Sequence, residues 1–287
     1  MSELRVTIAG LTVSVELPHA GWLPPLQPRF GKFLSDRRAD MACRLVLDAD
    51  ISRAPGGEPR IEEDETGLYL RHDNFEGHLP PDGPGRLTIF QSGADPEDAT
   101  YTMVVDSFVR LCLAQLLAAR GGAMFHAAGV AAGAAAGVAA GAGTERAAGY
   151  VFFGPSGSGK TTVCRLSHPR YRILCDEVIA VRPEGDGVRL YGTPFNGAWG
   201  DSLAEDVPLA EMFYLKQAPH TRRAPLRESE ALRALLESAV VYHRSTEFVS
   251  SLLDVLLGLM KRVPVTQLEF EPKESLWETV LSPTPAR

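Results

Sequence analysis

The sequence predicts a mixed α/β fold of the α+β type, with a β-rich N-terminal region over residues 1–100 and an α/β domain over residues 101–287. The N-terminal residues alternate apolar and polar side chains between turns rich in proline and glycine, which is the pattern of half-buried strands. The later residues alternate short apolar strands with segments of helical spacing, which indicates an α/β core with a mixed sheet.

The N-terminal region is predicted to begin with a hairpin. Apolar and polar residues alternate over residues 4–8 and 11–17, and Ala9-Gly10 lies between the two runs. Residues 61–71 and 85–90 give further strand candidates. This region contains no catalytic constellation in the sequence, so its histidines are interpreted as surface polar residues.

The second region opens with a predicted helix. Apolar side chains recur at helical spacing up to Arg120, and Gly121-Gly122 ends the helix. Residues 131–148 are almost entirely Ala and Gly, and we expect a flexible loop there because these residues have no apolar bulk to pack. Predicted strands cover residues 123–130, 149–153, 171–175, 178–181, 187–191, 212–215 and 264–270. Predicted helices cover residues 96–120, 161–167, 228–238, 247–262 and 274–281.

Composition bounds the class of protein. Of the 287 residues, 45% are hydrophobic and 23% are charged, which is ordinary for a soluble enzyme. The formal net charge of -7 argues against a nucleic-acid partner or an anionic membrane surface. The four cysteines have no metal-ligand spacing, and the N-terminus lacks the pattern of a signal peptide. We therefore expect a cytoplasmic protein with reduced thiols and no membrane-spanning segment.

A segment directly after the predicted strand 149–153 fits the spacing of the Walker A nucleotide-binding loop in full. Its glycines let backbone N–H groups converge on phosphate oxygens, and the start of the next helix favours an anion. Lys160 supplies a positive charge for the β- and γ-phosphates, and the Thr161 hydroxyl is a ligand for Mg²⁺. The residues expected to contact a nucleoside triphosphate are Gly154, Pro155, Ser156, Gly157, Ser158, Gly159, Lys160, Thr161 and Thr162.

Two further features are candidates for the chemistry of phosphate transfer. The acidic pair Asp176-Glu177 follows a predicted strand, where one carboxylate would hold Mg²⁺ and the other would take a proton from the acceptor. A solvated turn or a helix cap is the alternative interpretation of this pair. His126 lies in a predicted apolar strand, where a hydrogen-bonded core residue is the common role, but this strand is expected beside the one that leads into the loop. Arg222 and Arg223 are weaker candidates for anion contacts, with a solvated basic turn as the alternative.

Three segments in this order resemble the bacterial HPr kinase/phosphorylase-related serine kinases, and more closely the short HPr-kinase-like proteins. They are residues 121–130 (GGAMFHAAGV), 152–162 with the glycine loop, and 173–178 (ILCDEV). Residues 192–197 (GTPFNG) and the later Val263-Pro264-Val265 with Trp277 are also similar to that subgroup. The resemblance covers about residues 110–287, and the ordered set of histidine, loop and acidic pair is its most specific part.

The resemblance implies a P-loop core shared with HPr kinase and, more distantly, with ATP-dependent phosphoenolpyruvate carboxykinase. It implies that Asp176 is the base on an acceptor serine, that Glu177 belongs to the Mg²⁺ shell and that His126 lies near the transferred phosphate. True HPr kinases carry Asp where this chain has Glu177, and they have an acidic, glycine-flanked segment that we do not find here. The resemblance therefore does not extend to phosphorylase activity or to HPr as the substrate.

We therefore expect an ATP- and Mg²⁺-dependent kinase, a phosphotransferase that acts on a hydroxyl, with serine of a protein or peptide as the expected acceptor. The expected catalytic residues are Asp176, His126 and Lys160, and the expected metal ligands are Thr161, Glu177 and Asp176. True HPr kinases assemble into rings, so the resemblance allows a homo-oligomer. The alternatives are a nucleotide-binding regulatory module without catalysis and a carboxykinase-like enzyme that acts on a small acid.

Overall fold

The computed structural model of the chain describes residues 2–48, 60–90, 99–133, 147–242 and 246–282. The chain forms two compact units. Unit 1 comprises Met1–Arg120 and Val241–Ser251, and unit 2 comprises Gly121–Val240 and Leu252–Arg287. The boundary expected at residue 100 therefore differs from the division after Arg120 by the length of one helix, because that helix packs on the N-terminal sheet.

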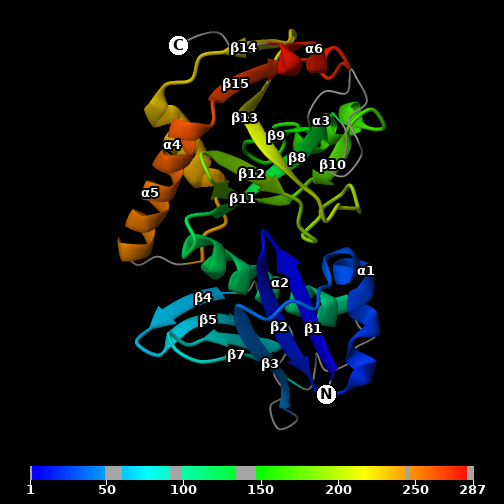
Figure 1. Ribbon diagram of the computed structural model, residues 1–287, viewed down its shortest axis with the longest axis vertical. Helices are drawn as coiled ribbons and strands as arrows, with labels where there is room; N and C mark the ends of the chain where they lie inside the picture. Colours follow the sequence, from blue (N-terminus) through cyan, green and yellow to red (C-terminus); the bar gives the residue numbers. More distant parts are fainter. Residues whose placement is uncertain (1, 49–59, 91–98, 134–146, 243–245, 283–287) are drawn as a thin grey trace. The chain divides into compact units, whose positions relative to one another are not determined.

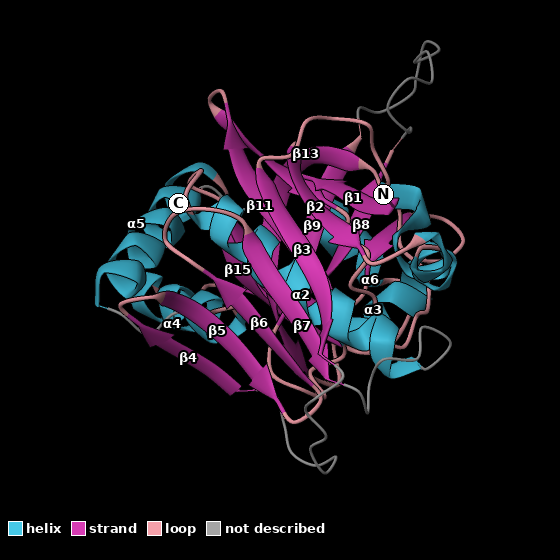
Figure 2. Cartoon of the chain, turned by 90° about the horizontal axis from the view of Figure 1, so that it is seen from below, coloured by secondary structure: helices cyan, strands magenta, loops and turns pink. Residues whose placement is uncertain are grey.

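Unit 1 is built on a seven-stranded mixed sheet with the strand order β1-β2-β3-β7-β6-β5-β4. Figure 2 looks onto several of these strands. The β2–β3 and β3–β7 pairs are parallel and the others are antiparallel. The strands are β1 (Ser2–Ile8), β2 (Leu11–Leu17), β3 (Met41–Asp48), β4 (Arg60–Asp64), β5 (Gly67–His72), β6 (Phe75–Leu79) and β7 (Gly85–Phe90).

The predicted N-terminal hairpin is confirmed. Strands β1 and β2 pair from Ser2↔Leu17 to Ile8↔Leu11. Ala9 and Gly10 form its tight turn, and both have positive φ angles, 53° and 73°. A turn of this kind matches the right-handed twist of the two strands, and glycine adopts it without strain.

One face of this sheet is covered by helix α2 (Ala99–Ala118), which packs on β2 and β6. Phe108 is fully buried, and a Cβ atom on Gly77 would lie only 2.6 Å from its ring, so the sheet needs glycine where the helix approaches most closely. Residues Tyr101–Ala118 are long and apolar enough to cross a membrane, but 61% of this stretch is buried within the structure. That is the pattern of a core helix in a soluble protein.

Short helical turns connect β2 to β3. They are η1 (Ala20–Trp22), η2 (Pro24–Leu26), α1 (Gln27–Phe30) and η3 (Gly31–Phe33). The Tyr101 hydroxyl of α2 donates a hydrogen bond of 2.9 Å to the carbonyl of Trp22, and the two rings meet edge to face. This contact ties the connection to the helix inside unit 1.

Unit 2 contains a second mixed sheet of eight strands with four helices around it among its described residues (Figure 1). Its strands are β8 (Ala123–Ala132), β9 (Ala148–Phe153), β10 (Arg172–Cys175), β11 (Val178–Glu184), β12 (Gly187–Tyr191), β13 (Asp206–Gln217), β14 (Arg222–Ala224) and β15 (Val265–Phe270). Its helices are α3 (Lys160–Ser167), α4 (Glu228–Ser238), α5 (Thr246–Arg262), of which residues 246–251 belong to unit 1, and α6 (Leu276–Leu281).

Five of these strands pair in a closed circuit, β8-β9-β13-β12-β11 and back to β8. Small residues let the circuit close. A Cβ atom on Gly129 would lie 2.9 Å from the Ile179 side chain, and one on Gly149 would lie 2.7 Å from Val207. The β9–β13 and β13–β15 pairs are parallel, so the sheet is mixed, as expected.

The core of unit 2 lies between this sheet and the helices α3 and α6. The Trp277 ring packs 4.0 Å from that of Tyr171, and its indole N–H donates a hydrogen bond of 3.1 Å to Ser167 Oγ. Ser167 Oγ in turn donates to the carbonyl of Val163, so the indole N–H and this hydroxyl are both paired. This packing fixes helix α3, whose first residue is Lys160.

Most predicted elements are confirmed at their type and position. Helix α4 and strands β7 and β12 have the predicted bounds, whereas β13 is longer than predicted. Strands β3, β6 and β14 and the turns between β2 and β3 were not predicted. The single strand predicted over residues 61–71 is instead a hairpin of β4 and β5, which pair from Arg60↔Arg71 to Asp64↔Gly67. The predicted Ala/Gly loop lies largely outside the described residues, as does the start of the helix predicted from residue 96.

Candidate functional site

The glycine loop connects the end of β9 at Phe153 to the start of α3 at Lys160, as predicted. Gly154, Gly157 and Gly159 have positive φ angles of 150°, 78° and 108°. At Gly159 glycine is also required for space, because a Cβ atom there would lie 2.5 Å from the buried ring of Phe270. The loop conformation therefore depends on its glycines.

The loop is held by one hydrogen bond within it and by one from the end of β13. The Ser158 N–H donates a hydrogen bond of 3.1 Å to the carbonyl of Pro155, and the Gln217 side-chain amide donates one of 2.8 Å to the carbonyl of Gly157. The Ser158 hydroxyl is buried and has no hydrogen-bond partner among the described residues. The loop thus contains a polar atom that the described part of the chain leaves without a hydrogen bond.

Lys160 is directed back along the loop. Its Nζ donates hydrogen bonds of 2.9 Å to the carbonyl of Gly154 and 3.2 Å to that of Pro155. Burial lowers the pKa of Lys160, and the nearby Glu177 carboxylate opposes this shift. A partly buried ammonium group that is hydrogen-bonded to neutral carbonyls has much to gain from an anion.

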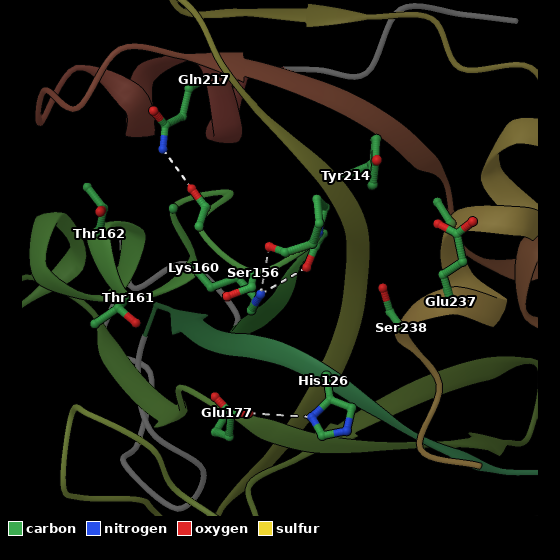
Figure 3. A pocket seen from close by; sticks show the side chains of 15 residues that line it. His126, Ser156, Lys160, Thr161, Thr162, Glu177, Tyr214, Gln217, Glu237 and Ser238 are labelled. Atoms are coloured by element: carbon green, nitrogen blue, oxygen red, sulfur yellow. Dashed lines mark hydrogen bonds and ion pairs between the residues drawn. The ribbon is translucent and has the colours of Figure 1, made fainter.

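A cavity of about 590 Å³ opens beside the loop (Figure 3). It is lined by most of the loop, by the start of α3 and by residues of β8, β13, α4 and the β10–β11 connection. Its lining residues are His126, Gly154, Pro155, Ser156, Gly157, Gly159, Lys160, Thr161, Thr162, Glu177, Tyr214, Gln217, Ala234, Glu237 and Ser238. Of the nine predicted nucleotide contacts, Ser158 is therefore the one that does not line the cavity.

His126 and Glu177 lie together on one side of this cavity. Strand β8 is buried at every position except His126, whose side chain is 46% exposed. His126 is therefore not the buried core residue of the alternative interpretation. Its Nδ1 lies 3.5 Å from Glu177 Oε1, and Figure 3 shows the two side chains directed at each other. The backbone supports the pair, since the Ala127 N–H donates a 3.0 Å hydrogen bond to the Glu177 carbonyl.

Asp176 lies elsewhere, although it is the neighbour of Glu177 in the sequence. Its side chain is 2% exposed and does not line the cavity. Its Oδ1 accepts a hydrogen bond of 2.7 Å from the Gly197 N–H, and its Oδ2 accepts one of 2.8 Å from the Trp199 N–H. The predicted acidic pair is thus divided, with one carboxylate at the cavity and one holding the loop that follows β12.

Five lining residues were not predicted as site residues, and all five come from β13 and α4. Two of them, Tyr214 and Ala234, lie within their elements, and two lie in the last turn of α4, namely Glu237 and Ser238. The fifth is Gln217, which holds the phosphate loop. No motif identifies these residues in the sequence. The strand β13 and the helix α4 were predicted, but which of their side chains face the cavity was not.

Arg222 and Arg223 fit neither interpretation offered for them, because they lie in strand β14 and pair with carboxylates away from the cavity. Arg223 forms a buried ion pair of 2.6 Å with Glu211. Arg222 lies 2.7 Å from Glu269, and its hydrogen bond, followed by that of His220, lowers the pKa of Glu269 to about 2. These arginines stabilise the sheet edge.

Comparison with known proteins adds no family to this description. A scan against protein-family models finds no match, and a search of the curated proteins finds none either. Within the described residues, no group of three or more His, Cys, Asp and Glu side chains is placed to hold a metal ion. What the site can do must therefore be argued from its own residues.

Proposed function

We propose that this protein is an ATP- and Mg²⁺-dependent phosphotransferase, a kinase that transfers a phosphoryl group to a hydroxyl, with serine of a protein or peptide as the acceptor. One observation carries the proposal. The glycine loop with Lys160 and the His126–Glu177 pair line the same cavity, although they come from separate parts of the sequence. A phosphate cradle beside a polar pair able to move a proton is what phosphoryl transfer needs.

The loop side of the cavity fits a triphosphate. Positive φ angles at three glycines and a helix N-terminus directly after them are features of loops whose backbone N–H groups bind phosphates. An anion would give the Lys160 ammonium group a charged partner in place of two carbonyls.

The residues present fit Mg²⁺ only as an ion shared with the nucleotide. Thr161 offers a hydroxyl and Glu177 a carboxylate on the same cavity, and Mg²⁺ is commonly held by one or two protein ligands together with phosphates and water. When bound, Mg²⁺ would neutralise charge on the β- and γ-phosphates. Asp176 is not part of this proposed set, because both of its oxygens accept backbone hydrogen bonds.

The acceptor hydroxyl would lose its proton to His126. The hydroxyl oxygen forms a bond to the γ-phosphorus, the bond from that phosphorus to the β–γ bridging oxygen breaks, and ADP leaves. The proton passes to the imidazole, and the resulting imidazolium is stabilised by Glu177, 3.5 Å away. This assigns proton transfer to His126 and a positioning role to Asp176, whereas the sequence alone favoured Asp176 as the base.

The resemblance to the HPr kinase/phosphorylase-related kinases supports the same reaction class, and we propose a P-loop kinase core of that type for unit 2. The cysteines Cys43, Cys112, Cys164 and Cys175 are free and buried, which is consistent with the cytoplasmic location that we propose. A ring-like homo-oligomer stays a prediction of the resemblance.

The test is transfer of labelled γ-phosphate from ATP to proteins and serine-containing peptides, with the Lys160→Ala and His126→Ala variants beside the wild type. We expect transfer that requires Mg²⁺, a loss of nucleotide affinity in the Lys160 variant and a fall of about 10²- to 10⁴-fold in the transfer rate of the His126 variant. Nucleotide binding without transfer or hydrolysis with any acceptor would instead favour a nucleotide-binding regulatory module.

A further inference from the structure

The cavity has a second wall that the phosphate loop does not use. It is formed by Tyr214 of β13 and by Ala234, Glu237 and Ser238 of α4. In Figure 3, Glu237 and Ser238 extend from α4 on the side of the cavity across from the loop. If the nucleotide phosphates occupy the loop side, this wall is left for the acceptor.

The wall is fixed next to His126. Directly after α4, the Val240 N–H donates a hydrogen bond of 2.8 Å to the carbonyl of Met124, and Ala239 forms a β-bridge with Phe125. The strand that carries His126 therefore also holds the end of α4. Glu237 and Ser238 line the same cavity as His126, so an acceptor bound with its hydroxyl at His126 can contact them.

The charges in the cavity are divided between the two sides. Lys160 provides a positive charge on the phosphate side, where the Glu177 carboxylate is near it, while Glu237 brings a carboxylate to the wall formed by α4. The Glu237 carboxylate is 66% exposed, and its ion pair with Arg233 is long at 3.8 Å. An exposed ion pair of this length contributes little to stability, so Glu237 is available to a cationic group of a ligand.

We propose that Glu237, with the Tyr214 ring beside the same cavity, selects an acceptor peptide in which the serine has a neighbouring Arg or Lys. This rests on the proposed function and adds its substrate class. Carboxylates pair with guanidinium and ammonium groups, and aromatic rings attract the same cations. Because Glu237 lies at the exposed rim of the cavity, a side chain of an extended peptide reaches it without entering the phosphate site.

The experiment measures binding, so that it does not depend on transfer. Two fluorescent peptides with one serine each, identical except for Arg or Glu next to that serine, are titrated with the full chain in Mg²⁺ and a non-hydrolysable ATP analogue. We expect the wild type to bind the Arg peptide about 5-fold more tightly, the magnitude of one exposed ion pair. The Glu237→Gln variant should lose this preference, and Glu237→Lys should reverse it.

The matched control is Glu228→Gln, which removes the same charge from the exposed first turn of the same helix, away from the cavity. It should keep the wild-type preference. Equal affinity of the wild type for both peptides, no measurable binding of either, or a preference for Arg that survives Glu237→Lys would each overturn the inference. The proposed function fails on a different measurement, the absence of phosphate transfer, so the two failures are distinguishable.

Discussion

Replacing Asp176 with Asn tests whether this carboxylate holds the protein together or performs chemistry. The wild-type side chain accepts two short hydrogen bonds, 2.7 Å from Gly197 and 2.8 Å from Trp199, and is 2% exposed. Asn keeps one acceptor oxygen but places an amide donor opposite the other N–H group. The variant therefore loses one charge-assisted bond, weakens the second and leaves a buried donor unpaired.

A hydrogen bond to a buried charged group contributes about 1.5–3 kcal/mol, so we expect Asp176→Asn to lower the free energy of unfolding by about 2–4 kcal/mol. Equilibrium urea unfolding of the full chain measures this change. Phosphate transfer by the folded variant should fall only modestly, because Asp176 does not face the cavity.

The matched control removes the charge of the next residue. Glu177→Gln changes a side chain that is 47% exposed, so its free energy of unfolding should change by less than about 0.5 kcal/mol, while transfer should fall more than in the Asp176 variant. A structural role of Asp176 would be contradicted if Asp176→Asn left stability within about 0.5 kcal/mol of the wild type and abolished transfer. Asp176 would then act as the base that the sequence predicted.

Four further substitutions test the loop, a helix and the sheet edge. Gly159→Ala should destabilise the protein by about 2–5 kcal/mol, because the new methyl group would lie 2.5 Å from the Phe270 ring at a φ of 108°. Gly157→Ala, with a φ of 78° and open space around it, should cost only about 1–2 kcal/mol, and similar unfolding midpoints for the two variants would contradict this account. Gly258→Ala, in α5 with nothing within 4 Å of the new methyl group, should stabilise the protein by about 0.5–1 kcal/mol in urea unfolding; a loss of stability would show a contact that we have missed. Glu269 has its pKa lowered from 4.5 to about 2 in the folded state, so its contribution to stability is present above pH 4.5 and is lost as pH falls through about 2. The unfolding midpoint should therefore fall less with decreasing pH for Glu269→Gln than for the wild type. An equal dependence of the midpoint on pH in the two proteins would contradict a stabilising role of the ion pairs of Glu269.

The parts of the fold that the sequence predicted are those that local patterns determine. The N-terminal hairpin has two alternating runs and a turn, and helix α4 has helical spacing, so both were found. Strand β6 is only five residues long and includes Gly77, which is needed for space under the ring of Phe108. Its place in the sheet follows from contacts with residues distant in the sequence, and local patterns do not report such contacts.

The candidate site was predictable to a similar extent. The loop between β9 and α3 is a continuous motif, and His126 was found from its place beside that motif. Which carboxylate of Asp176-Glu177 faces the cavity was not predictable, because neighbours on an extended chain point to opposite sides and the register of β10 on β8 shifts between Ile173 and Cys175. The wall at the end of α4 depends on hydrogen bonding to Met124, which no spacing in the sequence indicates.

The division of the chain also has a consequence for synthesis. Unit 1 includes Val241–Ser251, in which burial raises the pKa of Tyr242 to about 12. This segment follows the residues that line the cavity in the sequence, so it emerges after the candidate site has been made. Neither unit is complete as an uninterrupted piece of chain, and a cut after Arg120 leaves residues 241–251 without the sheet and helix they belong to. The strands of unit 1 are thus synthesised early, but unit 1 can finish folding only after the phosphate loop, the acidic pair and helix α4 have left the exit tunnel of the ribosome.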